Sequence, residues 1–255
     1  MIEVYNSVVT FLVLFAILGW IISLGTKNVT HVDSMWSIFF VIAMAVVAVN
    51  QTEITDRHIA FIMALLLWAS RLSIYLTIRN WGAPEDIRYR NIRANNEPNF
   101  HIKSIYIIFL LQAFLAAIIV LPVVAILIDD RPYDVKDKLS LAIILFGLVF
   151  QTIADTQLSN FLKKDNKRAV LSTGLWKYSR HPNYFGECLI WWGFFIAAIG
   201  DYFWVILLSP ILMTVLLLKI SGVGLMEQTI TSRRPGYKNY VKNTSSFLPW
   251  PPKKL

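Results

Sequence analysis

Seven apolar segments constrain this chain more than any other feature. Most of them approach the roughly 20 predominantly apolar residues that a helix needs to cross the hydrocarbon core of a bilayer, and the sixth is short. They cover Val4–Leu24, Met35–Val49, Ile59–Ile78, Ser104–Ile128, Leu139–Leu158, Glu187–Ile199 and Tyr202–Leu218. The sequence therefore predicts an all-α, polytopic membrane protein with about seven transmembrane helices, folded as a single membrane domain over residues 1–255.

The composition excludes several other classes of protein. Of the 255 residues 56% are hydrophobic and 16% are charged, whereas soluble domains carry about 25% charged residues. The net charge is +8, but the basic residues lie in short connections and not on one face of a soluble fold. We therefore expect anionic lipid headgroups and phosphorylated cofactors as counter-charges, and no nucleic acid. The single cysteine, Cys188, excludes a cysteine-based metal cluster, and no metal site is expected.

The distribution of Lys and Arg predicts the orientation. With seven spans, 19 basic residues fall on one side and four on the other, and Arg71 lies within a span. Positive charge accumulates in cytoplasmic loops, so the N-terminus is expected outside and the C-terminus in the cytoplasm.

Several ionisable or polar residues lie within or beside the predicted spans, where they are costly and usually functional. Arg71 shares a helix face with Tyr75, and Gln151 shares one with Asp155. The alternative for Arg71 is an arginine held by a carboxylate or by helix carbonyls. The stripe of Gln151 and Asp155 either lines a cavity or joins neighbouring helices.

Asp33 precedes the second span, and Trp36 follows three residues later. The acid is either a site residue or a helix cap or first-turn acid that the helix dipole favours.

The segment 174–187 is the richest in polar signals. Pro182 predicts the first turn of a helix, where its missing N–H costs nothing. Helix N-termini attract phosphate, and Arg180 and His181 add charge and donors at the same point. The alternative is a generic basic loop.

Within the helix predicted from Pro182, Asn183 and Glu187 lie four residues apart and share one face directed into the membrane. Gly186, between them, permits the close approach of a ring or of another backbone.

This segment resembles a known group of proteins. The run R-H-P-N-Y-x-G-E at 180–187 resembles the C-terminal part of membrane steroid 5α-reductases and of sterol C14 and C7 reductases, and in particular the bacterial DUF1295 family. Supporting matches are V-D-S-M-W at 32–36, R-L with a Tyr at 71–75, E-D-I-R-Y at 85–89, R-R-P-G-Y-x-x-Y at 233–240 and F-L-P-W at 247–250. The match is strong from about residue 151 to 252 and weaker in the N-terminal half.

The resemblance implies an enzyme of a bacterial inner membrane, with its cofactor site facing the cytoplasm. It would use NADPH to reduce the C4=C5 double bond of 3-keto-4-ene steroids, or of similar conjugated enone lipids, to the 5α product by hydride transfer. The substrate would be an apolar steroid or sterol-like molecule that arrives from the bilayer. Residues 1–130 are expected on the substrate side, and residues 139–255 are expected to hold the cofactor.

The resemblance also implies site residues. In the animal steroid enzymes a Glu and a Tyr hold the 3-keto oxygen, but this sequence lacks the matching Q-E pair. Asp33 is the expected counterpart of the Glu, Tyr75 or Trp36 is the expected counterpart of the Tyr, and Arg71 completes the catalytic set.

The cofactor residues transfer through matching motif positions. The nicotinamide and ribose end would contact Asp155, Asn183 and Glu187, with Tyr178 near the phosphates. The pyrophosphate and 2′-phosphate would contact Arg88, Arg168, Arg180 and His181, with Tyr237 or Tyr240 closing from the C-terminal tail. This arginine density favours NADPH over NADH. No G-x-G-x-x-G fingerprint is present, so a Rossmann site is not expected.

Two other functions fit part of the pattern. Isoprenylcysteine and phospholipid methyltransferases, which use S-adenosylmethionine, share the R-H-P-x-Y-x-G core. The pair of Asn183 and Glu187 favours the reductases, as does Glu227, which stands alone where the methyltransferases carry tandem Glu residues. A non-enzymatic lipid-binding or transport protein would suit the polar stripes but would not require a phosphate-binding arrangement.

Overall fold

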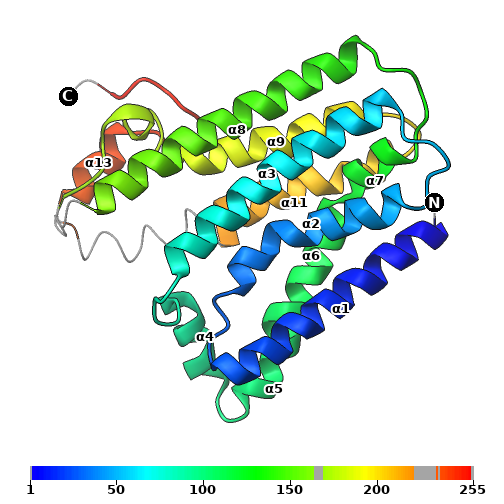
Figure 1. Cartoon of the computed structure of the whole chain (residues 1–255). Helices are drawn as coiled ribbons and strands as arrows, with labels where there is room; N and C mark the ends of the chain where they lie inside the picture. The colour runs from blue at the N-terminus through cyan, green and yellow to red at the C-terminus, as the bar shows by residue number, and fades with distance from the viewer. Residues whose placement is uncertain (1, 164–168, 221–233, 235, 254–255) are drawn as a thin grey trace. The chain divides into compact units, whose positions relative to one another are not determined.

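The computed structural model describes residues 2–163, 169–220, 234 and 236–253 (Figure 1). Every regular element among these residues is helical, and one isolated parallel bridge joins Ser179 and Ser245. The helices are α1 (Ile2–Thr26), α2 (Val32–Ala48), α3 (Asp56–Asn80), α4 (Ile87–Asn96), α5 (Phe100–Ser104), η1 (Ile105–Leu110), α6 (Leu111–Ile119), α7 (Leu121–Leu127), α8 (Val135–Leu162), η2 (Gly174–Lys177), α9 (Pro182–Ala198), α10 (Phe203–Ile206), α11 (Leu208–Val215), η3 (Leu216–Ile220) and α13 (Tyr237–Asn243).

Four of the described helices are long and apolar enough to cross a membrane: α1, α3, α8 and the continuous helix Phe100–Ile119. Two further apolar helices, Val32–Ala48 and Phe203–Lys219, are shorter. The all-helical prediction is confirmed, and the apolar helices are those of an integral membrane protein. Seven crossings and the orientation of the termini stay predictions.

Prolines divide two of the predicted spans. The fourth, predicted over 104–128, is interrupted at Val120, and Pro122 lies in the first turn of α7. The seventh, predicted over 202–218, separates into α10 and α11, with Pro210 near the start of α11. Because proline lacks the N–H that would bond to the carbonyl four residues earlier, each helix is interrupted just ahead of its proline.

The chain forms two compact units, and the first comprises residues 1–133 and 200–206. In this unit α2 lies between α1 and α3 (Figure 1). Aromatic rings connect the three helices: Phe39 meets Phe15 of α1 edge-on at 5.0 Å, and Phe40 meets Trp68 of α3 at 5.3 Å. These contacts place the core of the unit along α2.

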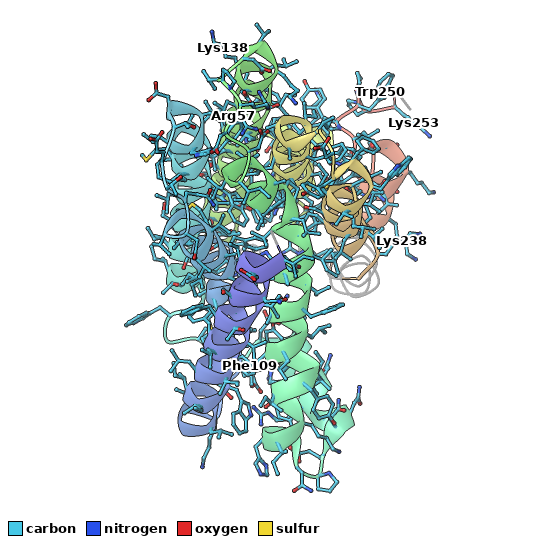
Figure 2. The ribbon with its side chains drawn as sticks, turned by 90° about the vertical axis from the view of Figure 1, so that its right-hand side faces the viewer. Arg57, Phe109, Lys138, Lys238, Trp250 and Lys253 are labelled. Atoms are coloured by element: carbon cyan, nitrogen blue, oxygen red, sulfur yellow. The ribbon has the colours of Figure 1, made fainter. Side chains whose placement is uncertain are left out.

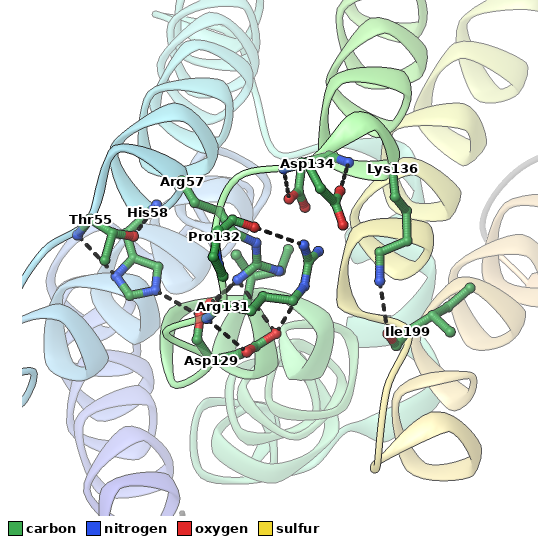
Figure 3. A network of polar contacts seen from close by, with 11 residues as sticks. Thr55, Arg57, His58, Asp129, Arg131, Pro132, Asp134, Lys136 and Ile199 are labelled. Atoms are coloured by element: carbon green, nitrogen blue, oxygen red, sulfur yellow. Dashed lines mark hydrogen bonds and ion pairs between the residues drawn. The ribbon is translucent and has the colours of Figure 1, made fainter.

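Arg57 is a buried residue of α3 with 1% of its surface exposed. Its Nη1 donates to the carbonyl oxygens of Ile126 and Asp129, each at 2.9 Å (Figure 3). The neighbouring His58 exchanges capping bonds with Thr55 and places its Nε2 3.2 Å from the Asp129 carbonyl. The start of α3 is therefore tied to the end of α7.

The second unit comprises residues 134–199 and 207–255. Asp134 and Asp137 form a reciprocal capping box at the start of α8 (Figure 3). From there α8 runs antiparallel and directly beside α9 (Figure 1). A Cβ atom on Gly186 would lie 2.7 Å from the carbonyl oxygen of Gly147, and a Cβ atom on Gly147 would lie 2.7 Å from that of Gly186. The close approach predicted at Gly186 is thus made by the backbone of α8, through the small-residue packing common between membrane helices.

Gly186→Ala should destabilise the folded protein by about 1–3 kcal/mol, because the added methyl group meets backbone and not a flexible side chain. The measurement is the apparent Tm of the detergent-purified protein. Gly25→Ala is the matched control, since a Cβ there meets nothing within 4 Å. Equal Tm values for the two variants would contradict the tight α8–α9 contact.

Candidate functional site

A ladder of buried polar side chains joins α8 to α9. Glu187 is 4% exposed, and its two carboxylate oxygens accept separate hydrogen bonds. Oε2 accepts from Nε2 of Gln151 at 2.7 Å, and Oε1 accepts from Nε1 of Trp191 at 3.0 Å. The carboxylate is therefore held in one orientation from both helices.

The second rung of the ladder is formed by Asn183 and Asp155, one helical turn away. Asn183 donates from Nδ2 to Oδ1 of Asp155 at 3.0 Å, which fixes the orientation of its amide. Its Oδ1 is buried and has no hydrogen-bond partner among the described residues. A buried acceptor left unsatisfied costs about 1–3 kcal/mol. This atom is consequently a natural partner for an N–H or O–H group of a ligand.

The predictions for this face are largely confirmed. The helix begins at Pro182, Asn183 and Glu187 share a face, and so do Gln151 and Asp155. Of the two roles predicted for the α8 stripe, the contacts show that it joins neighbouring helices.

Arg180 and His181 lie just ahead of α9 and hold the C-terminal tail, residues 244–253. Arg180 is 9% exposed, and its Nη1 donates to the carbonyl oxygens of Val241 at 2.9 Å and Thr244 at 2.8 Å. Nδ1 of His181 lies 3.0 Å from the Ser246 carbonyl oxygen. A basic side chain that binds the last carbonyls of a helix stabilises that end. Both side chains, predicted to contact phosphates, therefore make structural contacts here.

The three tyrosines predicted near the cofactor differ in exposure. Tyr240 is buried, with its Oη 2.5 Å from the carbonyl oxygen of Trp176. Tyr237 is buried beside it, with ring centroids 5.6 Å apart. Tyr178 is 42% exposed, and its carbonyl oxygen accepts from the backbone N–H of Trp250. Arg168 lies outside the described residues.

The first unit contains a separate polar cluster around Asp33, in the first turn of α2. Its Oδ2 accepts from Nη2 of Arg88 at 2.6 Å, and its Oδ1 accepts from Oη of Tyr89 at 2.6 Å. Nη2 of Arg79 lies 3.6 Å away. Asp33 thus meets the E-D-I-R-Y motif directly, and Arg88, predicted to contact cofactor phosphates, makes an ion pair with it.

Burial and charge keep both partners of Asp33 protonated. Burial, reinforced by the Asp33 carboxylate, raises the pKa of the Tyr89 hydroxyl well above its ordinary value. Burial alone would lower the pKa of Arg88, but the carboxylates of Asp33 and Asp86 outweigh it and raise the pKa. At neutral pH Tyr89 is therefore a hydrogen-bond donor.

The acidic residues of the same motif fix the loop that carries Tyr89. Asp86 caps α4 by accepting from the backbone N–H of Arg88 at 2.9 Å. Glu85 accepts a bidentate pair from Arg93 at 2.7 and 2.9 Å and also the backbone N–H of Val29 at 3.1 Å. The two motifs, 32–36 and 85–89, therefore form one polar cluster.

The other predicted catalytic residues lie on α2 and α3. The guanidinium of Arg71 stands over the ring of Tyr75 at 5.3 Å, which confirms their shared face. Trp36 packs edge-on against Phe40 at 5.2 Å, in the aromatic contact that leads to α3. The tyrosine whose hydroxyl donates to Asp33 is Tyr89.

Sequence reasoning assigned no site role to Tyr89 or Trp191. Tyr89 is part of the E-D-I-R-Y motif, and no local spacing connects it to Asp33. Trp191 lies four residues after Glu187, so the helical spacing used for Asn183 and Glu187 would have found it.

The loop around Glu85 should show a pH-dependent stability. Burial raises the pKa of Glu85, but hydrogen bonds from Arg93 and Val29 and the positive charge of Arg93 outweigh it and lower the pKa below its ordinary value of 4.5. The stabilisation is therefore complete above about pH 4.5 and is lost as the pH falls further, towards the lowered pKa.

The measurement is the apparent Tm of the wild type and of Glu85→Gln between pH 6 and pH 3.5. The wild-type advantage, on the order of 1 kcal/mol, should shrink steadily as the pH falls below about 4.5. The exposed Glu53→Gln controls for general acid effects and should follow the wild type. A wild-type advantage as large at pH 3.5 as at pH 6 would contradict the ion pair.

Among the described residues, no cluster of three or more His, Cys, Asp or Glu side chains is arranged to hold a metal ion.

Comparison with known proteins places the chain in a family. The sequence profile of a family described as a protein of unknown function, DUF1295, matches residues 19–244. An uncharacterized protein of Schizosaccharomyces pombe is 27% identical over 225 residues, which cover 75% of this chain and 64% of that relative's length. No solved structure shows significant similarity to the chain. Since the profile match covers most of the sequence, the chain belongs to the DUF1295 family.

Proposed function

We propose that this protein is an NADPH-dependent reductase of conjugated enone lipids, which converts 3-keto-4-ene steroids to 5α products. The observation that carries the proposal is the buried acceptor of Asn183, on a polar ladder between two apolar helices. Polar groups at such positions are costly, and function is the usual reason that they are kept.

The residues of the second unit fit the nicotinamide end of the cofactor. A nicotinamide carboxamide carries N–H donors, and the buried Oδ1 of Asn183 is an acceptor of matching chemistry. Asp155 orients that amide, while Glu187 is fixed by Gln151 and Trp191. When bound, the cofactor would supply the hydride.

The choice of NADPH over NADH rests on the basic loops of the sequence. Arg88 forms an ion pair with Asp33, and Arg180 donates to backbone carbonyl oxygens. We therefore propose that Arg88 acts on the substrate side.

In the first unit, Tyr89 and Asp33 suit the substrate ketone. Reduction of an enone develops negative charge on the ketone oxygen, and a fixed donor at that oxygen lowers the barrier. Tyr89 retains its proton at neutral pH and is positioned by Asp33, which Arg88 holds in turn. We propose that this phenol donates to the ketone, in the role that sequence reasoning gave to Tyr75 or Trp36.

The apolar helices fit a substrate that arrives from the bilayer. We also propose a bacterial inner membrane as the location, with the cofactor bound on the cytoplasmic side, because the basic loops predict that side to be cytoplasmic.

The test is direct. Purified protein is incubated with progesterone and NADPH, and loss of absorbance at 340 nm is followed together with product mass. A product heavier by two hydrogens, formed as the cofactor is oxidised, supports the proposal. Methyl transfer from S-adenosylmethionine without NADPH oxidation would contradict the reductase and support a methyltransferase instead. Parallel assays with NADH test the preference for the 2′-phosphate.

Asn183→Ala should lower turnover by about 10²-fold, because misplacement of a reacting group by about 1 Å has a cost of this order. It should also weaken cofactor binding, which is measured separately by protein fluorescence quenching. Thr152→Ala, on the exposed face of α8 beside Gln151, is the control and should behave as the wild type. Unchanged cofactor affinity in Asn183→Ala would remove Asn183 from the site.

Tyr89→Phe should lower kcat by about 10²- to 10³-fold, the usual effect of removing one donor to a developing oxyanion. Cofactor affinity should stay the same, since the substitution removes only the hydroxyl on the proposed substrate side. Tyr106→Phe, at an exposed tyrosine of the same unit, is the matched control. A normal kcat for Tyr89→Phe would exclude this phenol as the donor.

A further inference from the structure

The C-terminal tail forms a cavity of about 380 Å³ where it packs against the residues ahead of α9. Three basic side chains line it: Lys242 and Lys253, which are exposed, and Arg180, whose Nη1 binds backbone carbonyl oxygens. Asn243, Ser245 and Ser246 add amide and hydroxyl groups, and no acidic side chain occurs among the described residues of the lining. Such a composition suits a ligand with several acceptor oxygens and negative charge, such as a phosphate group.

Hydrogen bonds hold the backbone of the segment that lines the cavity. Trp250 N–H donates to the carbonyl oxygen of Tyr178 at 2.9 Å, and Lys253 N–H donates to that of Asn243 at 3.0 Å. The hydroxyl of Ser179 donates to the Phe247 carbonyl at 2.7 Å. The basic groups are therefore presented by a held segment and not by a free end.

Two large apolar side chains of the same tail are exposed. Leu248 is 62% exposed and Trp250 is 71% exposed, although Trp250 also lines the cavity. Figure 2 shows Trp250 and Lys253 together on the tail, and Lys238 at a distance from them on α13. Tryptophan beside lysine is typical of the membrane–water interface, where the ring meets the lipid and the charge meets the headgroups.

The position of the cavity beside the end of α8 fits the membrane–water interface. The 28 residues of α8 extend about 42 Å at 1.5 Å per residue, which exceeds the ~30 Å hydrocarbon core of a bilayer. The ends of α8 therefore reach the headgroup region. The tail is attached to Tyr178 and Ser179, just ahead of α9 and beside the C-terminal end of α8.

We propose that this cavity binds the phosphate of an anionic lipid headgroup while Trp250 and Leu248 contact its acyl chains. The occupant is a membrane lipid and not a nucleotide, because the exposed aliphatic side chain of Leu248, beside Trp250, suits an acyl chain and not a nucleobase. This inference goes beyond the proposed reaction, since it uses neither Asn183 nor Tyr89.

The experiment follows hydrogen exchange of residues 241–253, the end of α13 and the C-terminal tail, in the full chain reconstituted into nanodiscs. Discs of phosphatidylcholine are compared with discs that contain increasing phosphatidylglycerol. The anionic lipid should slow exchange of the tail amides in the wild type. Lys242→Ala/Lys253→Ala should weaken the affinity for phosphatidylglycerol by about 25-fold, since each lysine near an anionic surface contributes roughly fivefold. The variant should therefore need a higher fraction of phosphatidylglycerol for the same protection.

Trp250→Ala should also weaken the protection, whereas Lys238→Ala, which removes one positive charge outside the cavity, should leave it intact. Loss of protection in Lys238→Ala equal to that in the double variant would overturn the site in favour of general surface charge. Protection reproduced by NADP⁺ or inorganic phosphate in phosphatidylcholine discs would overturn the lipid as occupant. Protection independent of lipid charge would overturn the proposal altogether.

Discussion

The contact on which the second unit depends is the approach of two helix backbones at Gly147 and Gly186. Each glycine faces the carbonyl oxygen of the other, closer than any Cβ atom allows. At this separation Gln151 and Asp155 reach Glu187 and Asn183 within hydrogen-bond distance. Small residues let helix backbones approach closely, and the ladder lies beside this approach.

Local periodicity predicted what lies along one helix. The four-residue spacings of Arg71 with Tyr75 and of Asn183 with Glu187 gave the correct shared faces, because helix geometry alone decides them. The interruptions at Pro122 and Pro210 were missed, since hydropathy averaged over a window does not register one absent N–H. Apolar length therefore predicted where helices occur better than where each is continuous.

Contacts across long stretches of chain were outside the reach of the sequence. Asp33 and Tyr89 lie 56 residues apart, and no spacing rule connects them. Arg180 illustrates a second limit. A basic residue ahead of a helix predicts an anion, but backbone carbonyls are equally good acceptors, and here those of Val241 and Thr244 bind it. The sequence therefore identified Arg180 as a hydrogen-bond donor but not the acceptor that it binds.

The mutual contact of the two glycines has a genetic consequence. A bulky side chain in a core is often compensated by a smaller neighbour, but the atom that a side chain at position 186 meets is the backbone oxygen of residue 147, which every amino acid carries. No substitution at either position can therefore suppress a substitution at the other. Variation in this family should leave both positions glycine together, or else move the two helices apart and lose the ladder with them.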